Sequence, residues 1–79
     1  MVPLDLQVAF GQVIRELRLE AGLSQEALSL TCGRHRTYVS LIERGKNAPT
    51  VTTLWLISEA LGVALSTVVR RVEELIDTR

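Results

Sequence analysis

Apolar residues recur every three or four positions along most of the chain, and glycines interrupt this pattern between successive segments. In the first segment, Asp5 is the expected N-cap of a helix and Gly22 its expected stop. The apolar residues of this segment fall on one helical face: Leu6, Phe10, Val13, Ile14, Leu17 and Ala21. Such a stripe predicts an amphipathic helix that packs against a core. Because similar spacing returns in the later segments, the sequence predicts an all-α fold with five helices.

Two short helices are predicted in the middle of the chain, at about residues 24–44, with a tight turn at Gly33 between them. Ser24 is the expected N-cap of the first helix. The second is expected over about residues 36–44, with Gly45 as its stop. The residues predicted to face inward are Ala27, Leu28 and Cys32 in the first helix, and Val39 and Ile42 in the second.

Two further helices are expected after a loop at residues 47–49, where Pro49 disfavours helix in the residue before it. Thr50 is the expected N-cap of the fourth helix and Gly62 its stop. Its inward-facing residues are expected to be Leu54, Ile57 and Leu61. The fifth helix is expected to run from residue 65 or 66 to residue 77.

The fifth helix carries more apolar residues than one stripe against a small core requires. We therefore expect this helix, at about residues 65–77, to meet its symmetry mate in a homodimer. The residues expected at that interface are Val68, Val69, Val72, Leu75 and Ile76. The alternative is that these side chains only wrap around the core of their own subunit.

Length and composition predict a single domain over residues 1–79. Hydrophobic residues make up 47% of the chain, which suffices for a globular core. A chain this short buries only about 60% of its unfolded surface, so a partner subunit would add stability. Cys32 is the only cysteine, which excludes an internal disulfide and suits a reducing compartment. There is neither an apolar run of about 18 residues nor a signal peptide, so we expect a location in the cytoplasm of a bacterium or phage host.

The charges balance over the whole chain, with nine Lys and Arg against nine Asp and Glu, whereas nucleic-acid-binding proteins are commonly basic. The distribution is uneven, because four basic residues and a single acidic residue, Glu43, lie between Arg34 and Lys46. Attraction for phosphate depends on the local field. A basic segment on a neutral chain is therefore compatible with DNA binding of modest non-specific affinity.

The segment LSQEALSLTCGRHRTYVSLIERGK, residues 23–46, has the residue types that a helix needs to enter the DNA major groove. Ser29 is small where the two helices approach, Gly33 reverses the chain, and Val39 anchors the second helix. Polar residues gather near the start of that second helix, at His35, Arg36, Thr37, Tyr38 and Ser40. Since this end of the helix enters the groove, the pattern predicts a DNA-binding helix-turn-helix.

Residues 10–65 resemble the lambda Cro and repressor type of helix-turn-helix domain, the XRE family, through the pieces IRELRLEAGLSQEALS, RTYVSLIERGKNAPT and LISEALGVAL. The small size, the RTYVS sequence and the additional last helix resemble controller proteins of restriction-modification systems. This resemblance implies a dimeric transcription regulator that binds an inverted-repeat operator in double-stranded DNA. It would control its own promoter and that of a neighbouring nuclease, with RNA polymerase as a further partner. The alternatives are an antitoxin-type or phage-type repressor of the same fold, and a protein-interaction module without DNA binding.

The resemblance also implies roles for individual residues. The expected base-reading residues are Arg36, Thr37, Ser40 and Leu41, and arginine suits the O6/N7 edge of guanine. Contacts with the DNA backbone are expected from Gln25, Arg34, His35, Tyr38, Arg44, Lys46 and Asn47. Leu41 departs from the family, which often has a polar residue there, and Ser29 replaces the usual alanine. Arg18 and Glu43 resemble a family ion pair that fixes the recognition helix, and the alternative is two solvated side chains.

Other chemistry has little support in the sequence. Cys32 and His35 have a C-x-x-H spacing, but two ligands are too few for a structural zinc site, and no other Cys or His is present. The chain has no glycine-rich phosphate loop and is too short for an enclosed pocket. We therefore expect no enzymatic activity, metal, cofactor or small-molecule ligand.

Overall fold

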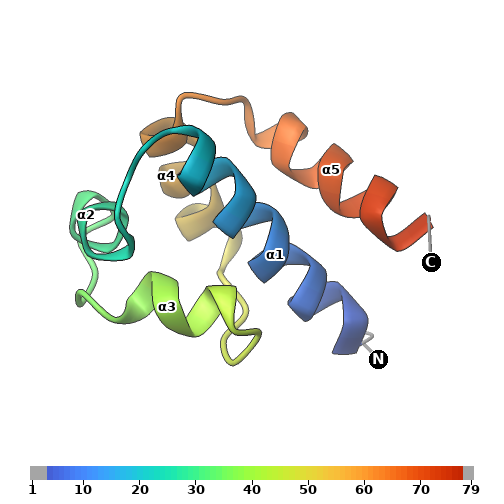
Figure 1. Ribbon diagram of the computed structural model, residues 1–79, viewed down its shortest axis with the longest axis horizontal. Coiled ribbons are helices and arrows are strands. Elements are labelled where there is room, and N and C mark those ends of the chain that lie inside the picture. The colour runs from blue at the N-terminus through green and yellow to red at the C-terminus, as the bar shows by residue number, and fades with distance from the viewer. Residues whose placement is uncertain (1–3, 78–79) are drawn as a thin grey trace.

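The computed structural model describes residues 4–77, which form five helices and no strand (Figure 1). The helices are α1 (Leu4–Glu20), α2 (Gln25–Thr31), α3 (Tyr38–Glu43), α4 (Val51–Leu61) and α5 (Leu65–Asp77). The predicted all-α class is confirmed. Within residues 4–77, no single helix is long and apolar enough to cross a membrane, and α4 and α5 reach that length and apolarity only as a pair bent by 103°.

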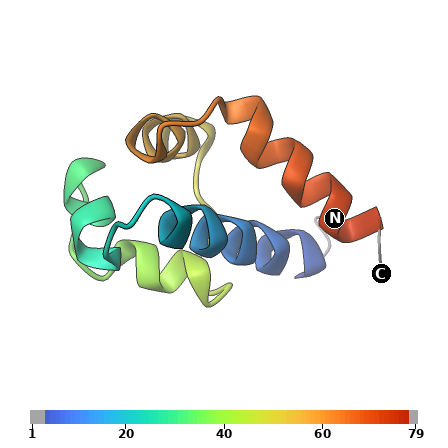
Figure 2. The same cartoon turned by 45° about the horizontal axis from the view of Figure 1, so that its top comes forward.

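Helix α1 lies between α3 on one side and α5 on the other in both views (Figures 1 and 2). Helix α5 runs back along α1 in the opposite direction, so the end of α5 lies beside the start of α1 (Figure 1). Helices α2 and α3 pack against each other, and α4 contacts both α2 and α5. The first helix therefore connects the two-helix unit α2–α3 to the last helix.

The core lies where these five helices meet. Its buried apolar residues are Ala9, Val13, Ile14, Leu17, Leu28, Cys32, Val39, Ile42, Ile57, Leu61, Val68 and Val72. Most of the residues predicted to face inward are in this set, and Leu6, Phe10 and Leu54 pack against it while partly buried. Ala21 is exposed, so its assignment to the inward face of the first helix was wrong, because α1 ends at Glu20.

Hydrogen bonds from side chains confirm two of the predicted helix starts. The Oγ atom of Ser24 accepts from the backbone N–H of Ala27 at 3.0 Å, and Oγ1 of Thr50 accepts from the N–H of Thr53 at 3.1 Å. These bonds satisfy N–H groups that lack a partner in the first turn of a helix. The predicted cap of the first helix was wrong, because α1 begins at Leu4 and Asp5 lies within its first turn.

The backbones of α1 and α3 approach each other closely at Gly11. A Cβ atom on Gly11 would lie 2.3 Å from the carbonyl oxygen of Ile42 and 3.0 Å from that of Glu43. Real side chains do not tolerate such distances to backbone atoms, so only glycine allows the two helices to sit this close. The distance between α1 and α3 therefore depends on one residue that the hydrophobic pattern does not reveal.

The last helix uses its valines differently from the sequence expectation. Val68 and Val72 are fully buried in the core of the chain, whereas Val69 is exposed and Leu75 and Ile76 are partly buried. The structure therefore removes Val68 and Val72 from the expected dimer interface, because α5 packs along α1 through the stripe that contains them. Arg71 adds a surface ion pair to this packing, with Nη1 donating to Oε2 of Glu20 at 2.9 Å.

Candidate nucleic-acid interface

The turn between α2 and α3 is built around Gly33, which has φ of +69°. Backbone bonds close the end of α2: the N–H of Gly33 donates to the carbonyl of Leu30 at 2.9 Å, and the N–H of Arg34 to that of Ser29 at 3.0 Å. A positive φ strains residues with a Cβ atom, so glycine is the residue that this helix end favours. The chain then turns toward α3 as the sequence predicts.

Ser29 joins the two helices of this unit. Its buried hydroxyl donates to the carbonyl of Gln25 at 2.9 Å and accepts from the backbone N–H of Val39 at 3.0 Å. The N–H of Val39 lies in the first turn of α3, where the helix itself offers no acceptor. Ser29 is therefore more than a small residue at a close contact, because it supplies the acceptor that a buried N–H requires.

Helix α3 begins at Tyr38, two residues later than the predicted start at residue 36. Arg36 and Thr37 form a turn in which the N–H of Tyr38 donates to the carbonyl of His35 at 2.9 Å. The first bond of the α-helical type follows, from the N–H of Leu41 to the carbonyl of Thr37 at 3.2 Å. Arg36 and Thr37 are exposed on this leading turn, so they lie immediately before α3 and not within it.

The ring of His35 bonds to this leading turn. Its Nδ1 atom accepts from the backbone N–H of Thr37 at 3.2 Å and lies 2.9 Å from Oγ1 of the same threonine. The imidazole thus bonds to the backbone of Thr37, the residue before α3, and α3 has no side-chain cap of the kind that Ser24 and Thr50 provide for α2 and α4. The family resemblance implies a contact of His35 with the DNA backbone, and the sequence did not indicate this bond to Thr37.

Arg18 and Glu43 lie together between α1 and the end of α3. Nε of Arg18 donates to Oε2 of Glu43 at 2.6 Å and Nη2 to Oε1 at 3.1 Å, while Nη1 donates to the carbonyl of Leu23 at 2.9 Å. Both side chains are almost entirely buried, and the hydrogen bond to Glu43 raises the pKa of Arg18 above its ordinary value. The interpretation of these residues as two solvated side chains does not hold.

Gln25 completes this network. Its Nε2 atom donates to Oε1 of Glu43 at 3.0 Å, so the amide faces the ion pair. An amide NH₂ has two hydrogens, and one of them is left for another acceptor. The network connects the start of α2, the end of α3 and the last turn of α1, and it thereby fixes the position of α3.

Arg34 connects the turn to the start of α4. Its Nη2 atom donates to Oγ1 of the buried Thr53 at 3.1 Å, and its guanidinium carbon lies 5.1 Å from the ring centroid of Tyr38. The second contact is a cation–π geometry. Burial raises the pKa of the nearby Cys32 thiol, and the positive charge of Arg34 opposes that rise. Arg34 therefore supports Tyr38 at the first position of α3.

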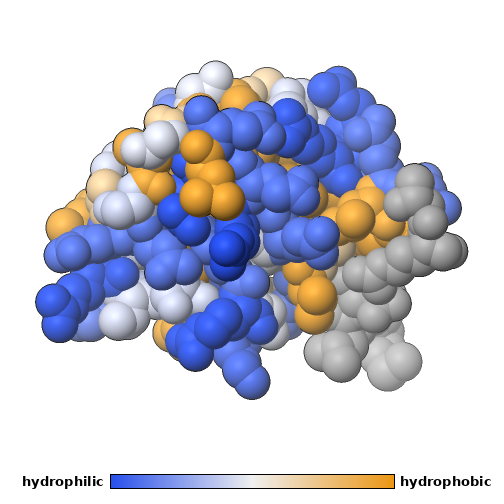
Figure 3. Space-filling view, viewed as in Figure 1, coloured by the Kyte–Doolittle hydropathy of each residue, from blue (hydrophilic) through white to orange (hydrophobic). Residues whose placement is uncertain are grey.

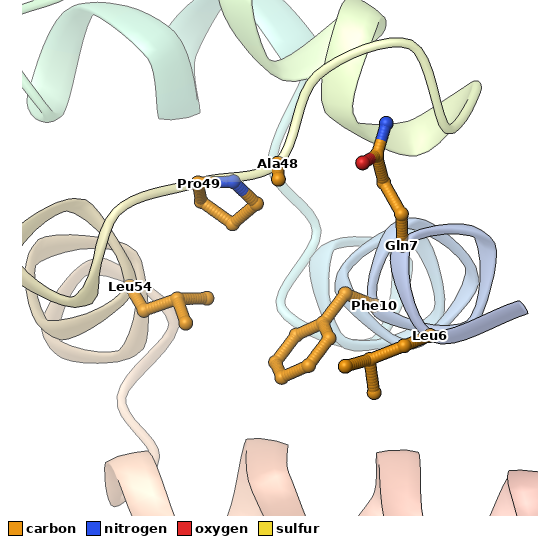
Figure 4. A pocket seen from close by; sticks show the side chains of 6 residues that line it. All are labelled: Leu6, Gln7, Phe10, Ala48, Pro49 and Leu54. Carbon is orange, nitrogen blue, oxygen red and sulfur yellow. The ribbon is translucent and has the colours of Figure 1, made fainter. Parts of the chain in front are cut away.

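The loop after α3 carries the remaining basic residues and is anchored to α1. Nε2 of Gln7 donates to the carbonyl of Gly45 at 2.8 Å, which holds this loop beside the first turns of α1. A small apolar cavity of about 150 Å³ lies beneath it and is lined by Leu6, Gln7, Phe10, Ala48, Pro49 and Leu54 (Figure 4). Lys46 and Asn47 are exposed between the anchored Gly45 and the residues of the loop that line the cavity.

Several candidate DNA-contact residues follow one another along the same side of α3 and the positions flanking it. Thr37, Ser40, Leu41 and Arg44 are spaced three and four positions apart, which places them on one helical face, while Val39 and Ile42 face the core. Arg36, Thr37 and Arg44 are exposed, and Ser40 and Leu41 are half-buried. The acidic residue of this segment, Glu43, is buried against Arg18, so its charge does not face outward. In the view of Figure 3, hydrophilic side chains cover most of the surface and hydrophobic side chains form separate patches between them.

Some residues that support this surface from within are not indicated by the sequence pattern. Gln7 and Thr53 bond to partners 38 and 19 positions away, so no local pattern reveals them. Gly11 could have been noticed in the sequence, because it lies inside a predicted helix. Glycine destabilises a helix by about 1 kcal/mol relative to alanine, so its presence there indicates a close packing contact.

Comparison with known proteins identifies the class of protein. Residues 14–68 of the 79-residue chain match the model of the Helix-turn-helix family. This match covers more than half of the chain, and the chain therefore belongs to the helix-turn-helix family. It is a DNA-binding regulator of this class.

Individual relatives narrow the similarity. The chain is 43% identical to control protein C.BamHI from Bacillus amyloliquefaciens over 60 residues, which are 75% of this chain and 74% of that protein. It is 37% identical to control protein C.MunI from Mycoplasma sp over 71 residues, which are 89% of this chain and 96% of that protein. The crystal structure of the restriction-modification controller protein C.AhdI from Aeromonas hydrophila matches with a TM-score of 0.74 at 37% identity, covering 78% of this chain and 94% of that chain. The resemblance to controller proteins is thus confirmed.

Proposed function

We propose that this chain is a sequence-specific transcription regulator that binds an inverted-repeat operator in double-stranded DNA as a homodimer, with residues 1–79 acting as one domain. The observation that carries this proposal is the buried network of Arg18, Glu43 and Gln25, which holds α3 at a fixed position while the flanking residues Arg36, Thr37 and Arg44 stay exposed. A helix that reads base edges must be held in a defined orientation. Similarity to restriction-modification controller proteins supports the same function.

In this proposal the leading turn and the exposed face of α3 enter the major groove. The base-reading residues are Arg36, Thr37, Ser40 and Leu41, with Arg36 donating to guanine and Leu41 offering apolar contact to a thymine methyl. The residues around them position the protein on the DNA backbone: Gln25, Arg34, His35, Tyr38, Arg44, Lys46 and Asn47. Gln25 has one amide hydrogen left for a phosphate, and Arg34 has further N–H groups beyond the one that Thr53 accepts.

The dimer is proposed to form through the outer side of α5. Val69, Leu75 and Ile76 are the apolar residues of the expected interface that are not fully buried. A twofold axis near this helix would present two copies of α3 to successive major grooves, about 34 Å apart. Exposed apolar residues also occur on α4, at Val51 and Trp55, so this second surface must be tested as a competitor.

The similarity to controller proteins supports a proposal for the cellular role. We propose control of the chain's own promoter and of a neighbouring nuclease gene, in the cytoplasm, with RNA polymerase as a partner at the promoter. The proposal includes no enzymatic reaction, metal, cofactor or small-molecule ligand.

The DNA-binding proposal can be tested by titrating the protein with a palindromic fragment of its own promoter and with random duplex DNA. We expect tighter binding to the palindrome, and a loss of about 1–3 kcal/mol of that specific binding for Arg36→Ala, with one base position relaxed. Lys46→Ala should instead weaken all sequences and lower the salt slope by about 1. Arg70→Ala, which removes an exposed charge from α5, is the control and should leave binding unchanged. Equal and negligible affinity for both DNAs would reject the function in favour of an interaction module.

The dimer proposal needs a separate measurement, such as sedimentation equilibrium over a range of concentrations. Val69→Glu places a charge on the outer side of α5 and should produce monomers, because an unpaired charge is costly at an apolar interface. Val51→Glu is the matched control, since it places the same charge on the exposed side of α4. Dissociation by Val51→Glu alone would move the interface to α4, and a wild-type monomer would reject the dimer.

A further inference from the structure

The contact between His35 and Thr37 determines where the hydrogens lie on both side chains. His35 is the only histidine of the chain, and both residues are exposed on the turn that leads into α3. The backbone N–H of Thr37 donates to Nδ1 of His35 at 3.2 Å, and the Oγ1 atom of Thr37 lies 2.9 Å from the same nitrogen.

This geometry selects one tautomer of the neutral imidazole. A nitrogen that accepts a backbone N–H must carry a lone pair, so the ring proton resides on Nε2. A lone pair on Nδ1 would repel an oxygen lone pair at 2.9 Å, so the favourable arrangement is one in which the hydroxyl of Thr37 also donates to Nδ1 and shares its single lone pair with the backbone N–H. A threonine hydroxyl has one hydrogen and two lone pairs, so only its acceptor sites remain for another molecule.

We infer that His35 acts through Thr37 as a positioning residue that sets base preference, because it presents the Thr37 hydroxyl to DNA as a hydrogen-bond acceptor only. This inference rests on the proposed function, in which Thr37 reads a base edge. The donors exposed in the major groove are the amino groups of adenine and cytosine, whereas guanine and thymine present acceptors there. The hydroxyl should therefore favour adenine or cytosine at the position it contacts and disfavour guanine or thymine.

The first test concerns the free protein and requires no DNA. Because the chain has one histidine, ¹⁵N labelling of histidine gives an unambiguous NMR signal for the tautomer. At a pH of about 8, where an ordinary imidazole is neutral, we expect the proton on Nε2 in the wild-type protein. A proton on Nδ1 would overturn the inference regardless of how the protein binds DNA.

The second test measures what the hydroxyl contributes to each base. Operators that differ at single base pairs are titrated with wild-type protein and with Thr37→Val, which keeps the bulk of the side chain and removes the hydroxyl. At the contacted position, Thr37→Val should raise the Kd about fivefold more for operators with adenine or cytosine than for operators with guanine or thymine. This factor corresponds to one net hydrogen bond. Contact of a methyl group with thymine occurs in both proteins and cancels in the ratio.

The role of His35 is then isolated by repeating the pair of measurements in two backgrounds. With His35→Ala the hydroxyl of Thr37 is free to donate or accept. Thr37→Val should then change the Kd by nearly the same factor for all four bases. With His35→Asn, whose side-chain oxygen can accept as Nδ1 does, the preference should return. The base preference at the position read by Arg36 serves as the internal reference and should not change. A change in overall affinity cancels in these ratios, so loss of the structural contact between His35 and Thr37 alone cannot produce the pattern.

The outcomes separate the inference from the proposed function. If wild-type protein binds no operator better than random DNA, the proposed function fails, and the NMR measurement still judges the hydrogen positions. Where the operator is bound and Arg36 reads its base, the inference is judged by Thr37→Val with His35 present. It is overturned if this substitution raises the Kd equally for all four bases or more for guanine or thymine. A preference that persists in the His35→Ala background overturns it as well.

Discussion

Two arginine–glutamate pairs attach different helices to α1, and their surroundings differ. Arg18 and Glu43 join α1 to α3 with 9% and 2% of their side chains exposed, whereas Arg71 and Glu20 join α5 to α1 with 36% and 57% exposed. Each arginine makes two hydrogen bonds to its glutamate. The buried pair also bonds to the carbonyl of Leu23 and the amide of Gln25, so its polar atoms are satisfied without water.

This difference in burial shows that α3 and α5 are held against α1 in different ways. Separating the buried pair would leave charges away from water, which is costly, so this pair specifies where α3 must lie. Separating the exposed pair lets water take over both charges, so it adds little to the position of α5. Helix α5 is held mainly by Val68 and Val72, which are fully buried against the rest of the core. The helix proposed to read DNA is thus fixed by a buried ion pair in addition to its apolar anchors Val39 and Ile42, whereas the helix proposed to form the dimer depends mainly on apolar packing.

The largest effect is expected from Glu43→Gln. Loss of the carboxylate leaves the buried guanidinium of Arg18 without its counter-ion, which should lower the free energy of unfolding by about 3 kcal/mol. Urea denaturation followed by circular dichroism measures this change. Glu20→Gln is the matched control on the exposed pair and should cost much less. The double variant Arg18→Met with Glu43→Leu should be more stable than Glu43→Gln, because no unpaired charge remains. Equal losses for Glu43→Gln and Glu20→Gln would remove the distinction between the two pairs.

Gly11→Ala tests the close approach that places the buried pair. An alanine normally stabilises a helix relative to glycine by about 1 kcal/mol. Here its Cβ would meet the carbonyl of Ile42, so we expect a net destabilisation of about 2 kcal/mol, as in overpacked cores. The same variant should weaken operator binding, since α3 must move away from α1. Gln12→Ala, at the next and exposed position of α1, should stay within about 0.5 kcal/mol of wild type. A stabilised Gly11→Ala protein would contradict the packing argument.

The sequence predicts those features of the fold that depend on residues close together in the chain. Helix spacing, the caps at Ser24 and Thr50 and the glycine stops follow from residues close together in the chain. The start of α3 was placed two residues too early, because Arg36 and Thr37 extend the polar pattern into a turn that His35 closes.

The remaining features depend on contacts between distant segments. An apolar stripe in the sequence does not distinguish between burial of Val68 and Val72 within the chain and burial against a partner. In the structure both are buried within the chain, because α5 packs on α1. The bond from Gln7 to Gly45 likewise has no local signal. The ion pair of Arg18 and Glu43 was suggested by family resemblance, since spacing alone does not bring positions 25 residues apart into contact.

A smaller effect is expected from Ser29→Ala, on the same side as the buried pair. The substitution leaves the buried N–H of Val39 without an acceptor, which should cost about 1–2 kcal/mol of stability. Thr31→Ala is a close control, because the hydroxyl of Thr31 also donates to the carbonyl four residues earlier but is exposed. If both variants lose the same stability, the bond between α2 and α3 contributes nothing beyond the helix itself.

The smallest effect should come from the exposed pair, as a dependence of stability on pH. The hydrogen bond from Arg71 lowers the pKa of Glu20 in the folded protein. A carboxylate with a lowered pKa contributes stability that is fully present above its unfolded pKa, and this contribution disappears as the pH falls through the lower folded value. Subtracting the urea midpoints of Glu20→Gln from those of wild type should therefore give a small positive difference at neutral pH that vanishes in acid. High salt should reduce the difference at neutral pH, because exposed charges are screened. A difference that grows in acid would mean that Glu20 is protonated more readily in the folded state, contrary to its pairing with Arg71.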